Sequence, residues 1–299
     1  MRAYLIINPA SGADEPVLSV VNRELAEAGI EWEPGITQRD EDAYRFAQEA
    51  GSRDDIDVIA VYGGDGTVTA VASGLLTIGS KKPLAILPGG TGNCIAQELG
   101  IPVDLEAATA LLRPGAHRMR SLDAIAMKGR HFLLRVGVGA DAEMIRAATR
   151  EQKDQLGWLA YFFGALNQRR AEPARYEIRL DDEVLEAEAI ACLVANIGRI
   201  GRAGIRLSQE IDPSDGKLDL MIIRNGDWST IAALGASVLG LEGEEPADPD
   251  APLLHRQAER VSILCDPQQP VHGDGDPHGE TPLEIEVLAN ALELCVPLE

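Results

Sequence analysis

The chain has 299 residues, of which 45% are hydrophobic and 25% charged, and these values suit a soluble globular protein of two domains. It carries 48 acidic and 27 basic side chains, which give a formal net charge of -21. This negative balance works against nucleic-acid binding and against broad adsorption to anionic membranes, so we expect no nucleic-acid partner.

Three observations indicate the compartment. The four cysteines are scattered and flanked by apolar residues, which is typical of buried, reduced thiols. Asn8 and Pro9 interrupt the apolar N-terminus before a signal-peptide core could form, and the stretch Leu156–Leu166 is too short to span a bilayer. We therefore predict a cytoplasmic protein. The sequence leaves its oligomeric state open, a homodimer included.

The first third of the chain alternates short apolar runs with segments of helical spacing. We expect strands at Tyr4–Ile7, Glu31–Thr37, Ile56–Tyr62 and Leu84–Leu87, and helices at about Pro16–Glu27, Asp40–Ala50 and Val68–Ile78. Strands that alternate with helices in this way predict a parallel sheet with right-handed crossovers.

The pattern changes from about Ser121, where runs typical of antiparallel hairpins begin. We expect strands at His131–Val138, Tyr176–Leu180, Val184–Val194, Lys217–Arg224, Val261–Cys265 and Leu283–Val287, with one helical insert near Gln155–Arg170. The predicted organisation is an α/β domain over residues 1–121 and a β-rich domain over residues 122–299. A return of the last strand to the first domain stays open.

Ligands of parallel α/β sheets bind at the carboxyl ends of the strands. The segment Gly63–Thr67 (GGDGT) directly follows an expected strand, and Gly89–Asn93 (GGTGN) repeats the arrangement after the next one. Glycine lets backbone N–H groups approach an anion, and the N-terminus of a following helix adds positive charge, so these loops indicate phosphate binding. A carboxylate beside a phosphate, here Asp65, holds a cation or handles a proton. A tight turn without a ligand is the alternative.

Other known motifs are missing from the sequence. Neither glycine loop is followed by Gly-Lys-Ser/Thr, so neither is a Walker A loop, and neither has the GxGxxG pattern of dinucleotide binding. The five histidines share no metal-ligand spacing, and we expect them at the surface.

Six segments in chain order carry a resemblance to a known family. They are Asn8–Gly12, Gly63–Thr67, Pro88–Asn93, Gly139–Ala142, Asp215–Asp219 and Asp274–Asp276. Together they resemble the motifs of the bacterial diacylglycerol kinase-like family, which includes sphingosine and ceramide kinase relatives. The resemblance covers nearly the whole chain. It implies an NAD-kinase-like α/β nucleotide-binding domain followed by an antiparallel β-sandwich, with the active site in the cleft between them.

The resemblance also implies an ATP- and Mg²⁺-dependent kinase that phosphorylates a lipid hydroxyl, diacylglycerol being the first candidate. Asp276 would be the general base, and Asp65 would orient the metal-nucleotide or the acceptor. The Asp215 side chain, with the backbone carbonyls of Asp212 and Lys217, would hold magnesium. The residues expected to contact ATP are Asn8, Thr37, Gly63, Gly64, Asp65, Gly66, Thr67, Val68, Thr69, Gly90 and Thr91.

Two residues depart from the family pattern. Asp276 stands where the family usually has Glu, which shortens the reach of the carboxylate by roughly 1 to 1.5 Å. Cys94 stands where many lipid kinases have Asp. These departures keep open the alternative of a catalytically silent regulator that binds a nucleotide or a lipid. An NAD kinase-like enzyme, which shares the GGDGT motif and the fold, is the other alternative.

A stretch that combines aromatic and basic residues bears on the substrate. Trp158 and Phe162 lie within it, and arginines flank it between Arg146 and Arg175. We expect transient peripheral contact with the inner membrane here, because aromatic side chains enter lipid while basic groups meet head groups. The alternative is a helix packed into the core.

Overall fold

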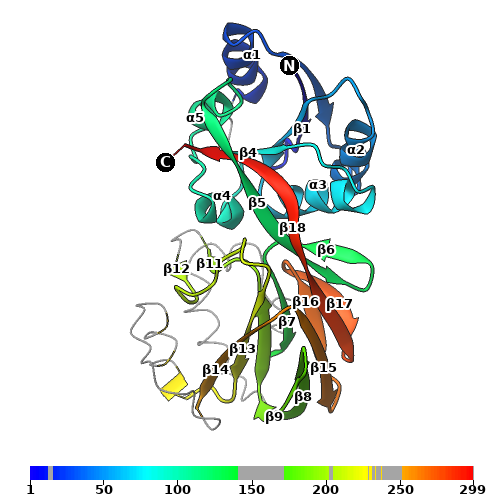
Figure 1. Ribbon diagram of the computed structural model, residues 1–299, viewed down its shortest axis with the longest axis vertical. Helices are drawn as coiled ribbons and strands as arrows, with labels where there is room; N and C mark the ends of the chain where they lie inside the picture. Colours follow the sequence, from blue (N-terminus) through cyan, green and yellow to red (C-terminus); the bar gives the residue numbers. More distant parts are fainter. Residues whose placement is uncertain are drawn as a thin grey trace. The chain divides into compact units, whose positions relative to one another are not determined.

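The computed structural model describes residues 1–12, 16–140, 172–201, 205–227, 229–230, 233, 237 and 251–298. The chain folds into two compact units (Figure 1). The first contains Met1–Leu122 together with Asn290–Glu299, and the second contains Asp123–Ala289. The predicted aromatic and basic stretch and the expected helix near Gln155–Arg170 lie outside the described residues.

A parallel sheet forms the centre of the first unit. Its strands are β1 (Arg2–Ile7), β2 (Glu31–Ile36), β3 (Val58–Gly63) and β4 (Leu84–Pro88), in the order β2-β1-β3-β4. Strands β3 and β4 are buried along their whole length, which is why they occur in the sequence as continuous apolar runs. The predicted parallel sheet is confirmed.

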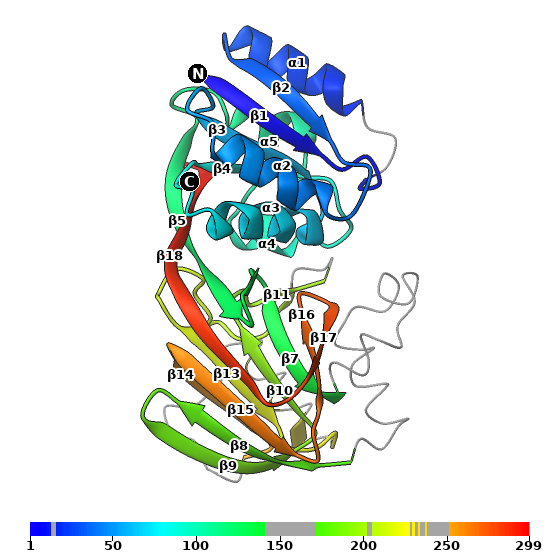
Figure 2. The ribbon, with the colours of Figure 1, turned by 90° about the vertical axis from the view of Figure 1, so that its right-hand side faces the viewer.

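Helices lie on both sides of this sheet (Figure 2). They are α1 (Val17–Glu27), α2 (Asp42–Gly51), α3 (Asp65–Thr77), α4 (Cys94–Glu98) and α5 (Leu105–Ala110). Helix α2 packs against α3, and α1 packs against α5. In α3, Val68, Val71, Ala72 and Leu75 are buried, so one apolar stripe with helical spacing anchors the helix that begins in the first glycine loop.

The second unit is an antiparallel β-sandwich, as the sequence predicts. One sheet contains β8 (Ala174–Leu180), β9 (Glu183–Ala189) and β15 (Arg260–Asp266), joined by parts of β5 (His117–Met127) and β18 (Leu283–Pro297) and by β6 (Arg130–Phe132). The other has the order β14 (Leu253–Ala258), β13 (Leu218–Ile223), β10 (Ala191–Ala195), β7 (Arg135–Gly139), β16 (Pro270–Gly273) and β17 (Asp276–Glu280). Apolar side chains from both sheets form one buried core.

Several strands differ from the sequence prediction. The expected strand His131–Val138 is interrupted after Phe132, so that β6 and β7 belong to different sheets. The expected strand Val184–Val194 divides into β9 and β10, which also belong to different sheets. Strand β18 is ten residues longer than predicted, since it runs over 15 residues instead of five, and it pairs with β15 in the second unit and with β4 in the first. Two short strands, β11 (Arg199–Ile200) and β12 (Ile205–Arg206), form a separate pair.

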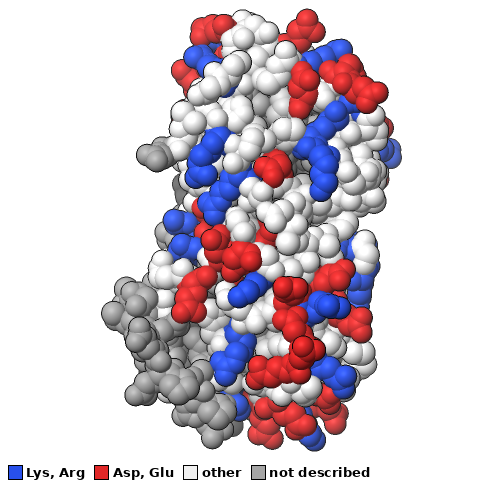
Figure 3. Space-filling model, viewed as in Figure 1, with Lys and Arg blue, Asp and Glu red and all other residues white. Residues whose placement is uncertain are grey.

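The charged side chains and the cysteines can now be placed in the structure. On the face that Figure 3 shows, acidic and basic side chains are interspersed among neutral ones. All four cysteines are buried and free of disulfides. Within the described part of the chain, no helix is long and apolar enough to cross a membrane. The expectation that the histidines lie at the surface is wrong for His272, which is 1% exposed in β16.

Candidate functional site

The carboxyl ends of four parallel strands bring the predicted nucleotide residues to one edge of the first unit. Strand β1 ends before Asn8 and β2 before Thr37, while β3 and β4 end in the two glycine loops. The N–H of Thr37 donates to the carbonyl of Ile7, so the ends of β1 and β2 are in register. Because the strands are parallel, their carboxyl ends lie at the same edge of the sheet, as expected from the sequence.

The two glycine loops are in direct contact. The N–H of Gly89 donates to the carbonyl of Gly63 at 2.9 Å. A Cβ placed on Gly90 would lie 2.4 Å from the Cα of Gly64, a distance that real Cβ atoms do not reach. The glycine at position 90 is therefore required by backbone packing between the loops, whether or not a ligand binds there.

Asp65 joins the first loop to the helix that follows the second. Its Oδ2 accepts a hydrogen bond from the N–H of Cys94, and its Oδ1 accepts one from the N–H of Ile95, both at 3.0 Å. These are the first two residues of α4, where a negative charge is stabilised by N–H groups that have no partner within the helix itself. The carboxylate therefore has a structural role at this edge, and its catalytic role stays a prediction.

Asn93 closes the second loop on itself. Its Oδ1 accepts from the N–H of Gly90 at 2.9 Å, and its Nδ2 donates to the Gly90 carbonyl at 2.8 Å. Its backbone is left-handed, with φ at 50°, a conformation that Asn tolerates better than most residues. Asn93 thus holds the loop in one shape, although we singled it out only as part of the glycine motif.

The end of β1 is tied to the start of α3. The amide Nδ2 of Asn8 donates to Thr67 Oγ1 at 2.9 Å, and Asn8 Oδ1 accepts from the N–H of Ala10 at 3.0 Å. The side chains of Val68 and Thr69 are buried within α3, whereas Gly66 and Thr91 are exposed. The predicted nucleotide residues thus share one edge, but those two helical side chains face the interior.

The N-terminus of α3 has the features of an anion site. Gly64 precedes the helix with an extended backbone and provides no side-chain cap for the first-turn N–H groups. A Cβ added at Gly66 would meet nothing within 4 Å, so no contact of the described chain demands glycine there. Open space beside the first-turn N–H groups of a helix is suited to a phosphate.

In the second unit, the predicted metal turn precedes β13. Asp215 Oδ1 accepts from the N–H of Lys217 at 2.9 Å, and Asp212 Oδ1 accepts from the N–H of Ser214 at 3.1 Å. Burial raises the pKa of the Asp215 carboxyl, and the negative charges of Asp219, Asp212 and Asp123 raise it further, against a lowering by the Lys217 N–H. In the described ranges, no group of three or more His, Cys, Asp or Glu side chains is arranged to hold a metal ion. The predicted magnesium site differs from such a group, because it uses one carboxylate side chain, that of Asp215, and the backbone carbonyls of Asp212 and Lys217.

Asp219 is the last residue of the same motif and is fully buried in β13. Its Oδ1 lies 2.7 Å from His255 Nε2 and accepts from Gln257 Nε2 at 3.0 Å. Its Oδ2 is buried with no hydrogen-bond partner among the described residues. A buried carboxylate oxygen without a donor is unfavourable, so this acidic surrounding of Asp215 is suited to a cation.

The predicted general base follows a tight hairpin turn. Asp274 and Gly275 both have positive φ, at 48° and 95°, between the paired residues Gly273 and Asp276, which is the geometry of a type I′ turn. Asp276 begins β17 and is exposed. Burial lowers the pKa of nearby His278, as does the Arg130 charge, while the charge of Asp276 opposes this shift.

Asp274 fixes this hairpin. Its carboxylate accepts three backbone hydrogen bonds, one each from the N–H groups of Leu133, Leu134 and Arg135, at 3.0, 3.0 and 2.9 Å. In the sequence, Asp274 stood out only as the first residue of the segment Asp274–Asp276. The Asp-Gly pair was the available signal, since it favours this hairpin turn, but the three donors come from a segment about 140 residues earlier.

Comparison with known proteins identifies both units. Residues 2–125 match the diacylglycerol kinase catalytic domain, and residues 134–296 match the YegS C-terminal NAD kinase beta sandwich-like domain. A diacylglycerol kinase of Bacillus subtilis (strain 168) is 28% identical over 303 residues, which cover 100% of this chain and 97% of the relative.

Solved structures agree with this match. The crystal structure of a diacylglycerol kinase from Bacillus anthracis (strain Sterne) superimposes with a TM-score of 0.77 at 25% identity, covering 99% of this chain and 97% of that one. Another structure from the same organism reaches a TM-score of 0.83 at 27% identity, covering 99% and 95%. The predicted resemblance is thereby confirmed, and the chain belongs to the diacylglycerol kinase-like lipid kinase family.

Proposed function

We propose that the protein is an ATP-dependent lipid kinase that transfers the γ-phosphate to a hydroxyl group of a lipid, diacylglycerol being the first candidate. The observation that carries the proposal is the arrangement at the carboxyl edge of the first unit. There the glycine loops touch, the N-terminus of α3 has no side-chain cap, and Gly66 adjoins open space. Family membership directs the proposal towards a lipid acceptor and away from a soluble nucleotide.

The first-turn N–H groups of α3 and the loop amides would bind and orient the phosphates. Phosphoryl transfer requires positioning and neutralisation of charge more than covalent chemistry by the protein. Asn8 and Thr67, which are hydrogen-bonded to each other, fix the approach of the first strand end to this helix. Asp65 holds the second loop in place through Cys94 and Ile95.

Asp276 would take the proton of the lipid hydroxyl. The hydroxyl oxygen attacks the γ-phosphorus, the bond to the ADP oxygen breaks, and the proton passes to the carboxylate, which gives a phosphate ester and ADP. The Asp276 side chain is exposed at the start of β17, and Asp274 fixes the turn before it. A rigid turn matters because Asp is shorter than the Glu that the family usually has.

Magnesium suits the turn before β13. The Asp215 carboxylate and the carbonyls of Asp212 and Lys217 would hold it, since Mg²⁺ prefers oxygen ligands. Bound there, it would supply positive charge that neutralises a cluster of carboxylates. Two features support this assignment: the raised pKa of Asp215, and the buried Oδ2 of Asp219, for which the described part of the chain offers no donor.

The test is transfer from γ-³²P-labelled ATP to a panel of diacylglycerol, monoacylglycerol, sphingosine, ceramide and phosphatidylglycerol, with NAD as the competing acceptor. We expect Mg²⁺-dependent labelling of one lipid. Labelling of NAD alone would overturn the proposal in favour of a nucleotide kinase. Binding of nucleotide or lipid without any transfer would favour a silent regulator.

Variants of Asp276 test the general base. Asp276→Asn should abolish transfer, because the amide cannot accept the proton, while nucleotide affinity stays the same. Asp276→Glu should preserve or raise turnover, because it restores the reach of the family's usual residue. Near wild-type turnover of Asp276→Asn would show that another group takes the proton.

Thermal unfolding of Asp215→Asn tests the metal assignment. The raised pKa means that the folded protein holds this proton more tightly than the unfolded chain, so ionisation lowers stability as the pH rises above the ordinary value of 3.8. In EDTA at pH 7 the variant should therefore melt about 1 to 2 °C above wild type, a small effect because Asp215 is exposed to solvent. The difference should vanish below pH 3.8. Mg²⁺ should stabilise wild type and leave the variant unchanged.

The membrane contact predicted for the aromatic and basic stretch around Trp158 and Phe162 is part of the same proposal. The expected result is weaker co-sedimentation of Trp158→Ala/Phe162→Ala with liposomes and a higher apparent KM for lipid in vesicles. Turnover on a short-chain, water-soluble analogue should stay nearly unchanged. An equal effect on both substrates would identify the stretch as core.

A further inference from the structure

We propose that Asn196 is a positioning residue, whose buried amide holds the Asp215 turn and the Asp276 hairpin in one fixed arrangement. The inference rests on the proposed function for what these two elements do. Asn196 follows the last residue of β10 and is 1% exposed. Its side chain belongs to none of the family motifs identified in the sequence.

The amide of Asn196 bridges two backbone segments. Its Nδ2 donates both hydrogens, one to the carbonyl of Asp123 and one to the carbonyl of Leu133, each at 2.9 Å. The backbone N–H groups of Asn196 and Ile197 both donate to the Leu134 carbonyl, at 2.9 and 3.2 Å. An NH₂ group with both hydrogens committed in a buried place leaves little freedom for either segment.

One of these segments carries the metal turn. The N–H of Asp123 donates to the carbonyl of Pro213 at 2.8 Å, and Asp123 Oδ2 accepts from the N–H of Gly216 at 2.7 Å. Asp123 is fully buried, and its two hydrogen bonds hold the backbone on both sides of Asp215. Displacement of Asp123 would move the predicted metal ligand with it.

The other segment carries the general base. Leu133, Leu134 and Arg135 donate their N–H groups to the Asp274 carboxylate, and the N–H of Asp274 donates to the Arg135 carbonyl at 3.0 Å. Asp276 is two residues further along the same hairpin. The segment therefore transmits the position of Asn196 to the turn before Asp276.

Asn196 also has an acceptor that the described residues do not satisfy. Its Oδ1 is buried without a hydrogen-bond partner among the described residues. A residue retained only to fill space would be better replaced by an apolar side chain, because an unsatisfied buried oxygen is unfavourable. The bridge to two functional segments gives a reason why an amide is kept here.

The test compares Asn196→Ala with Val261→Ala, a core variant of β15, whose backbone pairs with β8 and β18. Val261 is 1% exposed, so its truncation lowers stability by packing alone. Hydrogen exchange of the wild type and both variants should be measured at temperatures that lie the same number of degrees below each melting temperature. We expect faster exchange at both 133–135 and 213–216 in Asn196→Ala only. If that variant fails to fold, Asn196→Ser, which keeps one donor, takes its place.

The kinetic arm uses the proposed activity. Asn196→Ala should lower kcat ten- to about a hundredfold, the order expected for a misplacement of about 1 Å, with KM for ATP within about twofold of wild type. Val261→Ala, which leaves the backbone hydrogen bonds of both segments in place, should keep kcat within about twofold of wild type at temperatures where it is folded.

The outcomes separate the inference from the proposed function. Equal exchange and equal kcat in the Asn196 and Val261 variants would overturn the positioning role. Faster exchange at only one of the two segments would also overturn it, since the bridge requires both. A wild type without lipid phosphorylation would refute the proposed function, and the exchange measurement would still decide whether Asn196 joins the two segments.

Discussion

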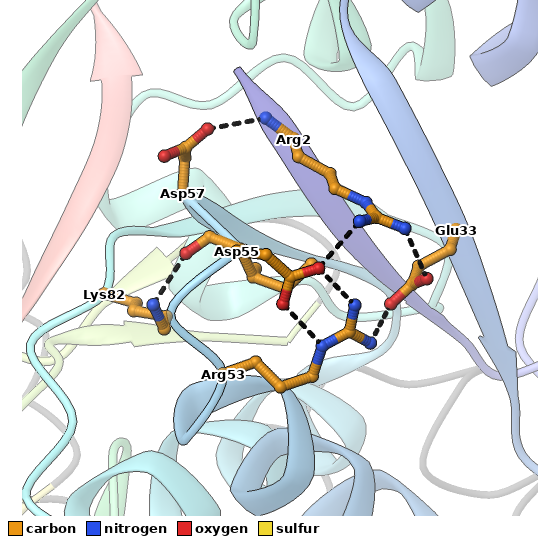
Figure 4. Close-up of polar contacts among 7 residues, drawn as sticks. Arg2, Glu33, Arg53, Asp55, Asp57 and Lys82 are labelled. Carbon is orange, nitrogen blue, oxygen red and sulfur yellow. Dashed lines mark hydrogen bonds and ion pairs between the residues drawn. The ribbon is translucent and has the colours of Figure 1, made fainter.

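The two edges of the parallel sheet in the first unit are held together by different means. At the carboxyl edge, glycine backbones touch each other and short side chains bond to the backbone, as Asp65 and Asn93 do. At the amino edge, long charged side chains form an ion-pair network (Figure 4). In it Arg2 bonds to Asp55 at 2.7 Å, and Arg53 bonds to Asp55 at 2.8 Å and to Glu33.

This difference shows which edge depends on exact geometry. Hydrogen bonds from backbone N–H groups at 2.9 to 3.0 Å leave no room for an added atom, and a phosphate would bind to backbone N–H groups at this edge. Exposed ion pairs can rearrange and contribute little to stability each. We therefore expect changes at the carboxyl edge to affect activity and changes at the amino edge to affect only stability.

The largest effect is expected for Gly90→Ala. The new Cβ would lie 2.4 Å from Gly64 Cα, and because that atom belongs to the backbone, the loops must separate. Phosphate transfer should fall by at least about a hundredfold. The measurement is kcat together with nucleotide affinity by calorimetry, with circular dichroism to check the fold. A folded variant with wild-type turnover would show that the contact between the loops is unimportant.

Asp65→Asn should come next. The amide keeps one acceptor but sets an NH₂ group against the other α4 N–H, and the loss of a charged hydrogen bond should lower the free energy of unfolding by about 1 to 3 kcal/mol. We expect transfer to be abolished or nearly so, because the second loop is displaced.

Asp104→Asn is the matched control for Asp65. Asp104 caps α5 through one bond to the N–H of Ala107 at 2.8 Å and lies outside the glycine loops. Asn and Asp are about equal as helix caps, so stability should change by only a few tenths of a kcal/mol and activity not at all. Equal effects of the two substitutions would contradict a special role of Asp65.

Gly66→Ala should separate affinity from stability. The added Cβ meets no atom of the described chain within 4 Å, and Ala at a position without positive φ stabilises a protein by about 0.4 to 1 kcal/mol, because the unfolded chain has less freedom to lose. The variant should therefore melt higher than wild type and yet bind ATP about tenfold more weakly, because the methyl group occupies the space proposed for phosphate. A variant that is stabilised with unchanged ATP affinity would place the nucleotide elsewhere.

Much of the fold could be predicted from the sequence because apolar runs and helical spacing are local. Helix α3 nevertheless begins at Asp65, three residues before the predicted start, since a first helical turn tolerates Gly and Asp that the helix interior disfavours. Strand β18 continues to Pro297 through Ala289, Asn290 and Ala291, which are residue types of low strand preference, because pairing with its neighbours outweighs that preference.

The site could be predicted only in part, for the same reason. The parallel sheet places the glycine loops at one edge, so their meeting follows from the sequence. The bonds of Asp65 to residues 29 and 30 positions later, and those of Asn196 to Asp123 and Leu133, depend on tertiary approach and have no local signal. The position of Cys94 as the first residue of α4 is likewise evident only from the structure.

The smallest effect is expected at the amino edge, for Arg53→Gln. Arg53 is 36% exposed in its side chain, and the melting temperature should fall by only about 1 to 3 °C at low salt, with kcat and ATP affinity unchanged. In 1 M salt the difference should nearly disappear, because exposed charges are then screened within about 3 Å. Asp104→Asn serves as the control that leaves this edge intact.

The difference in melting temperature between wild type and Arg53→Gln should depend on pH. The hydrogen bond from Arg53, with the charges of Arg53 and Arg2, lowers the pKa of Asp55 to about 2. A carboxyl whose pKa is lowered by folding stabilises the protein above its unfolded value of 3.8 and loses that contribution as the pH falls towards 2. The gap in melting temperature between wild type and Arg53→Gln should therefore be constant above about pH 5 and close progressively below pH 4. A gap that persists at pH 2, or a loss of activity in the variant, would show that the amino edge does more than stabilise the sheet.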